Sequence, residues 1–91
     1  MSKPTEQEVA AALELAKRMR EQGKDPQFIA KSLLSHHYRL GYLEDVLQAV
    51  ERFLRSGMAE DEHQRLLKVV ERARQAEERT AKQNSNELGL G

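Results

Sequence analysis

The chain has 91 residues, no cysteine, and fifteen basic residues balanced by fifteen acidic ones. This length allows one small domain, and the absence of cysteine excludes disulfides and thiolate metal sites. Because the net charge is zero, no long-range field of one sign is available to attract nucleic acid or an anionic membrane.

A first helix is predicted over 5–22. Thr5 and Glu8 have the spacing of a capping box, and Gly23 is the residue type that commonly ends a helix in the left-handed conformation. Apolar residues recur between them at helical spacing: Val9, Ala12, Leu13, Ala16 and Met19. Since this row is rich in alanine, we expect the helix to pack closely on its neighbour and to bury a modest area.

Two further helices are predicted over 26–40 and 43–56. Asp25 and Pro26 suit the start of the first, Gly41 suits its end, and His37 falls near the middle of its apolar side. The helix over 43–56 is the most apolar in the chain, so we expect it to lie at the centre of the fold.

A fourth helix is predicted over 60–82, with an acidic first turn that its dipole favours. Leu66, Val69, Ala73 and Ala76 form a row with alternating spacings of three and four residues, typical of a coiled-coil seam. Because this seam weakens along the helix, its second half has little to bury within one chain. We therefore expect a two-fold dimer contact there.

These elements predict an all-α fold: a bundle of four helices, or three plus a long protruding C-terminal helix, joined by short glycine-containing connections. No alternating strand pattern or hairpin turn occurs in the sequence. We expect a single helical domain over 1–83 and a disordered tail over 84–91.

The sequence carries no recognisable catalytic or metal site. His36 and His37 are adjacent, so on a helix they point about 100° apart and are poorly placed to hold one ion. His63 has only Glu60 one turn away. With no cysteine, no nucleophile elbow and no glycine-rich phosphate loop, we expect no enzyme activity, no metal, no cofactor and no small-molecule substrate.

Nucleic-acid binding is the alternative function. Arg65, Lys68 and Arg72 form a short basic line, but acidic residues interleave with it in the sequence, as they do on many solvated helices. The acidic start at Glu44 and Asp45 would also repel phosphate if that helix read DNA. The expected partner is therefore a protein.

Three residues near Gly41 are candidates for partner binding. Tyr38 and Tyr42 belong to a residue type favoured at interface hot spots, although both rings could instead cap a small core with their hydroxyls in water. His37 could be a pH-sensitive contact, although a core or interface histidine is the simpler interpretation.

The function predicted from these features is a non-enzymatic interaction module that self-associates as a homodimer. The predicted partner-binding residues are His37, Tyr38, Tyr42, Leu66, Val69, Ala73 and Ala76. No apolar run reaches the length of a signal peptide or a membrane span, so we expect a cytoplasmic protein.

Overall fold

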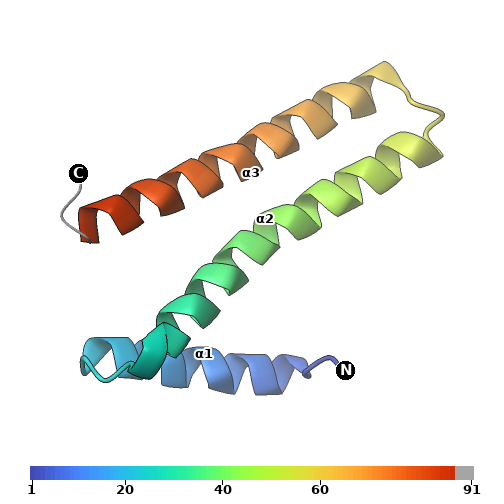
Figure 1. Ribbon diagram of the computed structural model, residues 1–91. Coiled ribbons are helices and arrows are strands. Elements are labelled where there is room, and N and C mark those ends of the chain that lie inside the picture. The colour runs from blue at the N-terminus through green and yellow to red at the C-terminus, as the bar shows by residue number, and fades with distance from the viewer. Residues whose placement is uncertain (88–91) are drawn as a thin grey trace. The chain divides into compact units, whose positions relative to one another are not determined.

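The computed structural model describes residues 1–87, with side chains through Lys82 (Figure 1). It consists of α1 (Glu6–Glu21), a short 3-10 turn η1 (Pro26–Phe28), α2 (Ile29–Arg55) and α3 (Glu60–Glu87). Residues 1–87 contain no β-strand, which confirms the all-helical class. The predicted four-helix bundle is wrong, because α2 covers both of the helices expected in the middle of the chain, whereas the alternative with a long C-terminal helix fits the 28 residues of α3.

The predicted capping signals of α1 are confirmed. The backbone amide of Glu8 donates to Thr5 Oγ1 at 3.1 Å, and the amide of Thr5 donates to Glu8 Oε1 at 2.8 Å. At the other end Gly23 has a φ of 69°, and the amide of Lys24 donates to the carbonyl of Met19. The helix therefore lies within one residue of the predicted range at each end.

Asp25 does not cap the 3-10 turn that follows it directly. It caps the first residues of α2, which lie five and six positions further along the chain. Its carboxylate accepts hydrogen bonds from the amides of Ala30 (2.7 Å) and Lys31 (3.0 Å), and it pairs with Arg20 at 3.1 Å. Burial raises the pKa of Asp25, but these hydrogen bonds and the charge of Arg20 outweigh it, so that the pKa is lowered overall.

Gly41 does not end a helix. It lies within the 27 residues of α2, and its φ is not in the left-handed region, which Gly23 and Gly57 do adopt. A glycine inside a helix costs about 1 kcal/mol relative to alanine, a penalty that packing can override. The helix continues because Tyr38, Arg39 and Tyr42, on both sides of the glycine, bond to α3.

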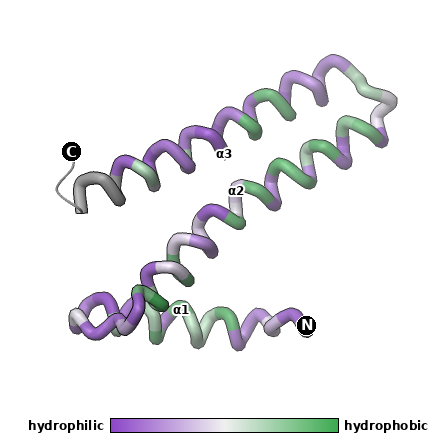
Figure 2. The backbone as a smooth tube through the Cα atoms, in the orientation of Figure 1, coloured by the Kyte–Doolittle hydropathy of each residue, from purple (hydrophilic) through white to green (hydrophobic). Residues whose placement is uncertain are grey.

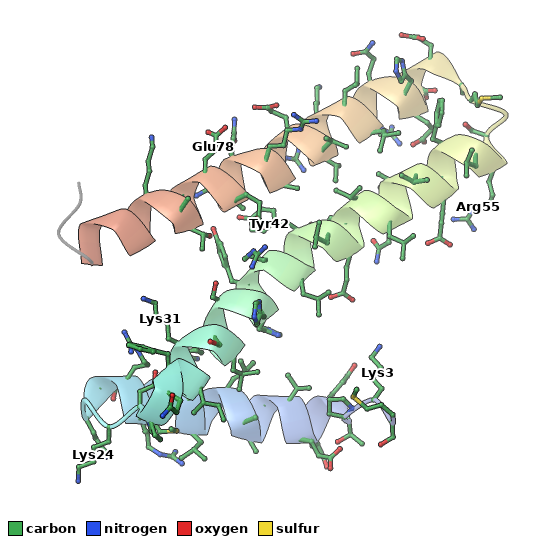
Figure 3. All side chains as sticks on the ribbon, in the orientation of Figure 1. Lys3, Lys24, Lys31, Tyr42, Arg55 and Glu78 are labelled. Carbon is green, nitrogen blue, oxygen red and sulfur yellow. The ribbon has the colours of Figure 1, made fainter. Side chains whose placement is uncertain are left out.

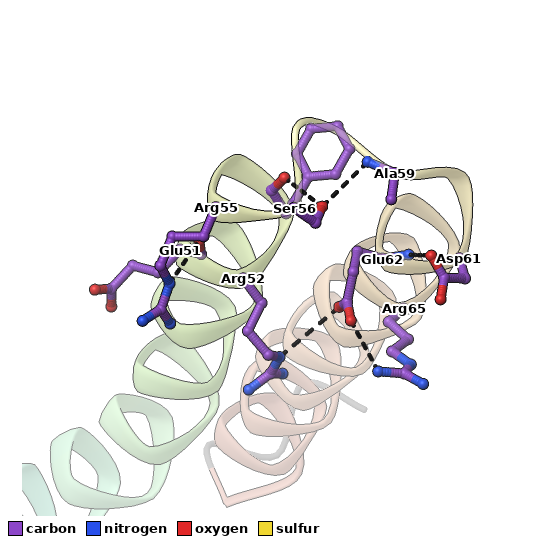
Figure 4. A network of polar contacts seen from close by, with 9 residues as sticks. Glu51, Arg52, Arg55, Ser56, Ala59, Asp61, Glu62 and Arg65 are labelled. Atoms are coloured by element: carbon purple, nitrogen blue, oxygen red, sulfur yellow. Dashed lines mark hydrogen bonds and ion pairs between the residues drawn. The ribbon is translucent and has the colours of Figure 1, made fainter.

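The turn between α2 and α3 is formed by residues 56–59 (Figure 4). Ser56 Oγ donates to the carbonyl of Phe53 and accepts from the amide of Ala59, while Gly57 has a φ of 71°. Met58 also has a positive φ, of 62°. These local bonds end α2 and begin α3 at the positions that the sequence predicts.

The C-terminal end of α3 differs from the prediction. The helix continues through 84–87, where the sequence led us to expect a disordered tail, and residues 88–91 lie outside the described part of the chain. No proline or glycine interrupts the sequence between residues 60 and 88, so no local signal ends the helix at 84.

The single domain predicted for 1–83 divides into two compact units, Met1–His37 and the chain from Tyr38 onward. In the first unit, α1 is followed by the start of α2, and Ala16 and Ala30 are each 2% exposed. In the second unit, the rest of α2 and α3 form an antiparallel helical hairpin. The helices are tied together by contacts between Arg39 and Glu77 far from the turn and between Phe53 and His63 near it.

Within residues 1–82 the buried residues share one property: all are alanine. They are Ala16, Ala30, Ala49, Ala73 and Ala76. Small side chains let two helices approach closely, but each methyl group contributes only about 0.8 kcal/mol of burial, against about 1.5–3 kcal/mol for a leucine side chain. The larger apolar side chains of the described residues are therefore half-buried or exposed.

Candidate protein-interaction surface

The seam predicted on the fourth helix faces α2 of the same chain. Ala73 and Ala76 are 9% and 1% exposed, and Leu66 and Val69 are half-buried. On α2 the facing residues are Tyr42, Val46, Ala49 and Phe53. These four α3 residues, predicted to bind a partner, thus lie in the core of the hairpin, and the unburied seam that motivated the expected dimer contact is covered within the chain.

Tyr38 and Tyr42 join α2 to α3 through Arg79. Their rings meet edge to face with centroids 5.3 Å apart, and Arg79 Nη2 donates to both hydroxyls, at 3.2 and 3.3 Å. The hydrogen bond from Tyr42, aided by Arg79, lowers the pKa of Tyr38, while the same tyrosine pair raises the pKa of Tyr42. The cluster is a cross-helix clamp, and its hydroxyls bind a guanidinium.

A second polar contact reinforces this end of the hairpin. Arg39 Nε donates to Glu77 Oε1 at 2.6 Å, and the hydrogen bond and charge of Glu77 raise the pKa of Arg39. Near the turn, Glu62 lies between Arg65 (2.9 Å) and Arg52 (3.9 Å), as Figure 4 shows. The Arg39–Glu77 and Arg52–Glu62 pairs join the two helices, whereas the Arg65–Glu62 pair lies within α3.

The histidines are dispersed. His36 and His37 are exposed and belong to the first unit, whereas Tyr38 and Tyr42 belong to the second. His63 stacks at a tilt on Phe53, with ring centroids 5.7 Å apart, and its Nδ1 lies 3.7 Å from Glu60. Within residues 1–87 no group of three or more histidine, cysteine or acidic side chains is placed to hold a metal ion.

The second unit exposes a row of leucines on α2. Leu43, Leu47 and Leu54 are 54%, 60% and 62% exposed, and Leu40 continues the row. With Val50, these residues repeat at alternating spacings of three and four, the same period as the row that packs on α3. Helix α2 therefore carries two adjacent apolar rows one residue apart, of which only one is covered.

Helix α3 adds to the same side of the hairpin. Successive residues of a helix are rotated by about 100°, so Leu43 lies one step round from Tyr42, and Leu67 lies one step round from Leu66. Both helices are right-handed and run antiparallel. On each helix, the residue that follows an inward-facing residue therefore lies on the same side of the hairpin. Leu67, which is 51% exposed, and Val70 thus join the leucines of α2.

We call this surface the leucine face. Its residues are Leu43, Leu47, Val50 and Leu54 of α2 and Leu67 and Val70 of α3. Figure 2 shows hydrophobic shading along the second half of α2 and the first half of α3, with hydrophilic bands between. Single exposed leucines are ordinary on a protein surface, whereas a row at coiled-coil spacing has the pattern on which helices pack.

The opposite side of the hairpin is polar. One step backward from the α3 seam gives a row of five residues, of which four are basic: Arg65, Lys68, Arg72, Gln75 and Arg79. Of the nearby acidic residues, Glu71 and Glu78 lie elsewhere on the helix, whereas Asp61, four residues before Arg65, lies on the same side. Figure 3 shows Glu78 on the outer side of α3, whereas Tyr42 lies between α2 and α3.

The sequence analysis expects unburied apolar surface on the C-terminal helix, whereas most of the exposed leucines of the second unit lie on α2. The spacing of Leu43, Leu47, Val50 and Leu54 was visible in the sequence, but the row was assigned to the centre of the fold because it is strongly apolar. Which of two adjacent rows is covered depends on the fit to α3, and a one-dimensional pattern does not contain that information.

Comparisons with protein families, with characterised proteins and with solved structures give no match, so the proposals below rest on the residues and their geometry. Among the helices of residues 1–87, none is both long enough and apolar enough to span a membrane.

Proposed function

We propose that this protein is a non-enzymatic interaction module that binds another protein through the leucine face of its α2–α3 hairpin. The observation that carries the proposal is the exposure of Leu43, Leu47 and Leu54 on a helix whose two buried residues are both alanine. Burying a leucine side chain is worth about 1.5–3 kcal/mol, so a partner that covers this row would gain several times that amount before its entropic costs.

The hairpin is suited to present such a surface. The clamp of Arg79 on the two tyrosines and the Arg39–Glu77 ion pair hold the two helices in one register. A rigid surface loses little conformational entropy on binding, which favours affinity. The tyrosines predicted as partner contacts would then act by holding the hairpin together rather than by touching the partner.

The test is capture of partners by the full-length protein from cells that naturally express it, comparing three forms. Leu47→Asp places a charge in the leucine face, whereas Gln48→Asp places the same charge on the neighbouring exposed residue. We expect the wild type and Gln48→Asp to retain the same protein, and Leu47→Asp to lose it. If capture does not depend on Leu47, the leucine face is not the binding surface.

Nucleic-acid binding is the second candidate, and the row of Arg65, Lys68, Arg72 and Arg79 favours it. The row is partly engaged, since Arg65 pairs with Glu62 and Arg79 bonds to the two tyrosines. Anisotropy of labelled duplex DNA and RNA, at about 50 mM salt, where phosphate contacts are strongest, tests it. Binding that is lost in Lys68→Glu/Arg72→Glu would support this function, and no binding by the wild type would remove it.

A further inference from the structure

The charges bordering the leucine face have one predominant sign. Acidic residues lie on the outward-facing sides of both helices, next to the leucine face. They are Glu44 and Glu51 on α2 and Glu60, Glu71 and Glu78 on α3, and all five are exposed. We call these residues the acidic rim.

Basic residues near the leucine face are fewer. Arg74 lies beyond Val70 on the same side, and it is spaced three residues from Glu71 and four from Glu78, the spacings at which opposite charges interact on a helix. Arg55 lies at the turn end, on the outer side of α2 (Figure 3). Arg39, four residues before Leu43, pairs with Glu77, so the two add no net charge. Arg74 and Arg55 offset part of the acidic rim and leave the border of the leucine face negative.

We infer that the occupant of the leucine face is an amphipathic helix whose apolar row is flanked by lysine or arginine. This inference rests on the proposed function and identifies the class of partner. An apolar row of matching period would cover Leu43, Leu47 and Val50, and basic flanks would meet the acidic rim, as flanking charges set partner choice in coiled coils.

The same charges disfavour the two other obvious occupants. A second copy that met the first face to face would bring two acidic rims together, and like charges across an interface oppose association. An anionic membrane surface would be repelled by the acidic rim, because such surfaces attract basic flanks. The negative border therefore selects a basic helix from among the ligands that an apolar row can accept.

The experiment uses two labelled synthetic helices of about 21 residues, long enough to span the row from Leu40 to Leu54 at about 1.5 Å per residue. Both carry leucine at the a and d positions of the heptad. One has lysine at every e and g position, and the other has glutamate. Like charges at these positions keep each peptide from pairing with itself.

Fluorescence anisotropy with the full-length protein at low salt should give about tenfold tighter binding of the lysine-flanked peptide, because several exposed ion pairs each contribute a fraction of a kcal/mol. Leu47→Asp should abolish binding of both peptides, and Gln48→Asp should not. The triple variant Glu44→Lys/Glu51→Lys/Glu71→Lys should reverse the preference. Raising the salt concentration should reduce the preference, since the rim is exposed.

The remaining outcomes distinguish the two proposals. Equal binding of both peptides, abolished by Leu47→Asp, would overturn the choice of a basic partner and leave the interaction function standing. A dimer in sedimentation that dissociates in Leu47→Asp would do the same, with a second copy as the occupant. If neither peptide binds and the protein is monomeric, the inference about the partner is wrong. Dependence of cellular capture on Leu47 then decides the proposed function separately.

Discussion

Replacing Ala76 by leucine should destabilise the α2–α3 hairpin. Ala76 is 1% exposed and lies one turn before Arg79, which bonds to Tyr38 and Tyr42 of α2, so the larger side chain has no space unless the helices separate. Overpacking a well-fitted core costs about 1–3 kcal/mol. For a domain of 60–100 residues, each kcal/mol lowers the melting temperature by about 4–8 °C, so the loss is readily measured.

The assay is urea unfolding followed by far-ultraviolet circular dichroism, with Ala81→Leu as the matched control. Ala81 lies on the same helix and is exposed, so its replacement should change the free energy of unfolding by no more than about 0.5 kcal/mol. Equal effects of the two substitutions would refute the buried position of Ala76. So would a stable Ala76→Leu protein whose only change is a lower mass in sedimentation, because the seam would then face a second copy.

Four further predictions concern two glycines, the Asp25 cap and the tyrosine clamp. Gly41→Ala should raise the free energy of unfolding by about 0.5–1 kcal/mol, because a Cβ there meets no atom within 4 Å and the residue is helical. Gly57→Ala should lower the free energy of unfolding by about 1–2 kcal/mol, because the φ of Gly57 is 71°. Destabilisation by Gly41→Ala in the same urea titration would argue that α2 is broken at Gly41. Because the pKa of Asp25 is lowered in the fold, its ionised form stabilises the fold at pH values above its ordinary pKa of 3.8. This stabilisation is lost as the pH falls through the lower pKa of the folded state. Asp25→Asn should therefore lose less stability than the wild type between neutral and acid pH in thermal melts, and identical pH profiles would contradict the capping role. Arg79→Gln should return the pKa of Tyr38 toward 10.0, seen in ultraviolet titration of the tyrosines, whereas an unchanged titration would show that the guanidinium does not bind the hydroxyls in solution.

The predicted partner-binding residues show what a sequence pattern can and cannot predict. Leu66, Val69, Ala73 and Ala76 were correctly identified as one continuous apolar row, because helical periodicity depends only on spacing. That the row faces α2 of the same chain follows from the turn at 56–59 and from contacts between residues some forty positions apart, such as Arg39 with Glu77. Spacing along one helix carries no information about such pairs.

The alternating charges on α3 were also interpreted too simply. In the sequence Glu71 and Glu78 separate the basic residues and dilute them. On the folded helix they lie on the outward-facing side, whereas Arg65, Lys68 and Arg72 share the polar side of the hairpin. The acidic and basic residues of α3 can be assigned to different sides of the hairpin only when it is known which residues of α3 face α2.

The sequence by itself determined the all-helical class and most of the helix ends. Thr5, Gly23 and Gly57 act through hydrogen bonds and backbone angles within a few residues, so their roles can be inferred without the rest of the fold. Residue 41 is also a glycine, but unlike Gly23 and Gly57 it does not adopt the left-handed conformation. The continuation of α2 through Gly41 goes with contacts to α3 on both sides of it.

Tertiary structure decided which apolar row of α2 is buried. The leucine row is the more hydrophobic, and hydrophobicity alone would place it inside. The row that is covered contains Ala49, and the seam on α3 contains Ala73 and Ala76. Small side chains on both helices allow a closer approach than leucines would, so the fit between backbones favours the alanine row and leaves the leucine face exposed.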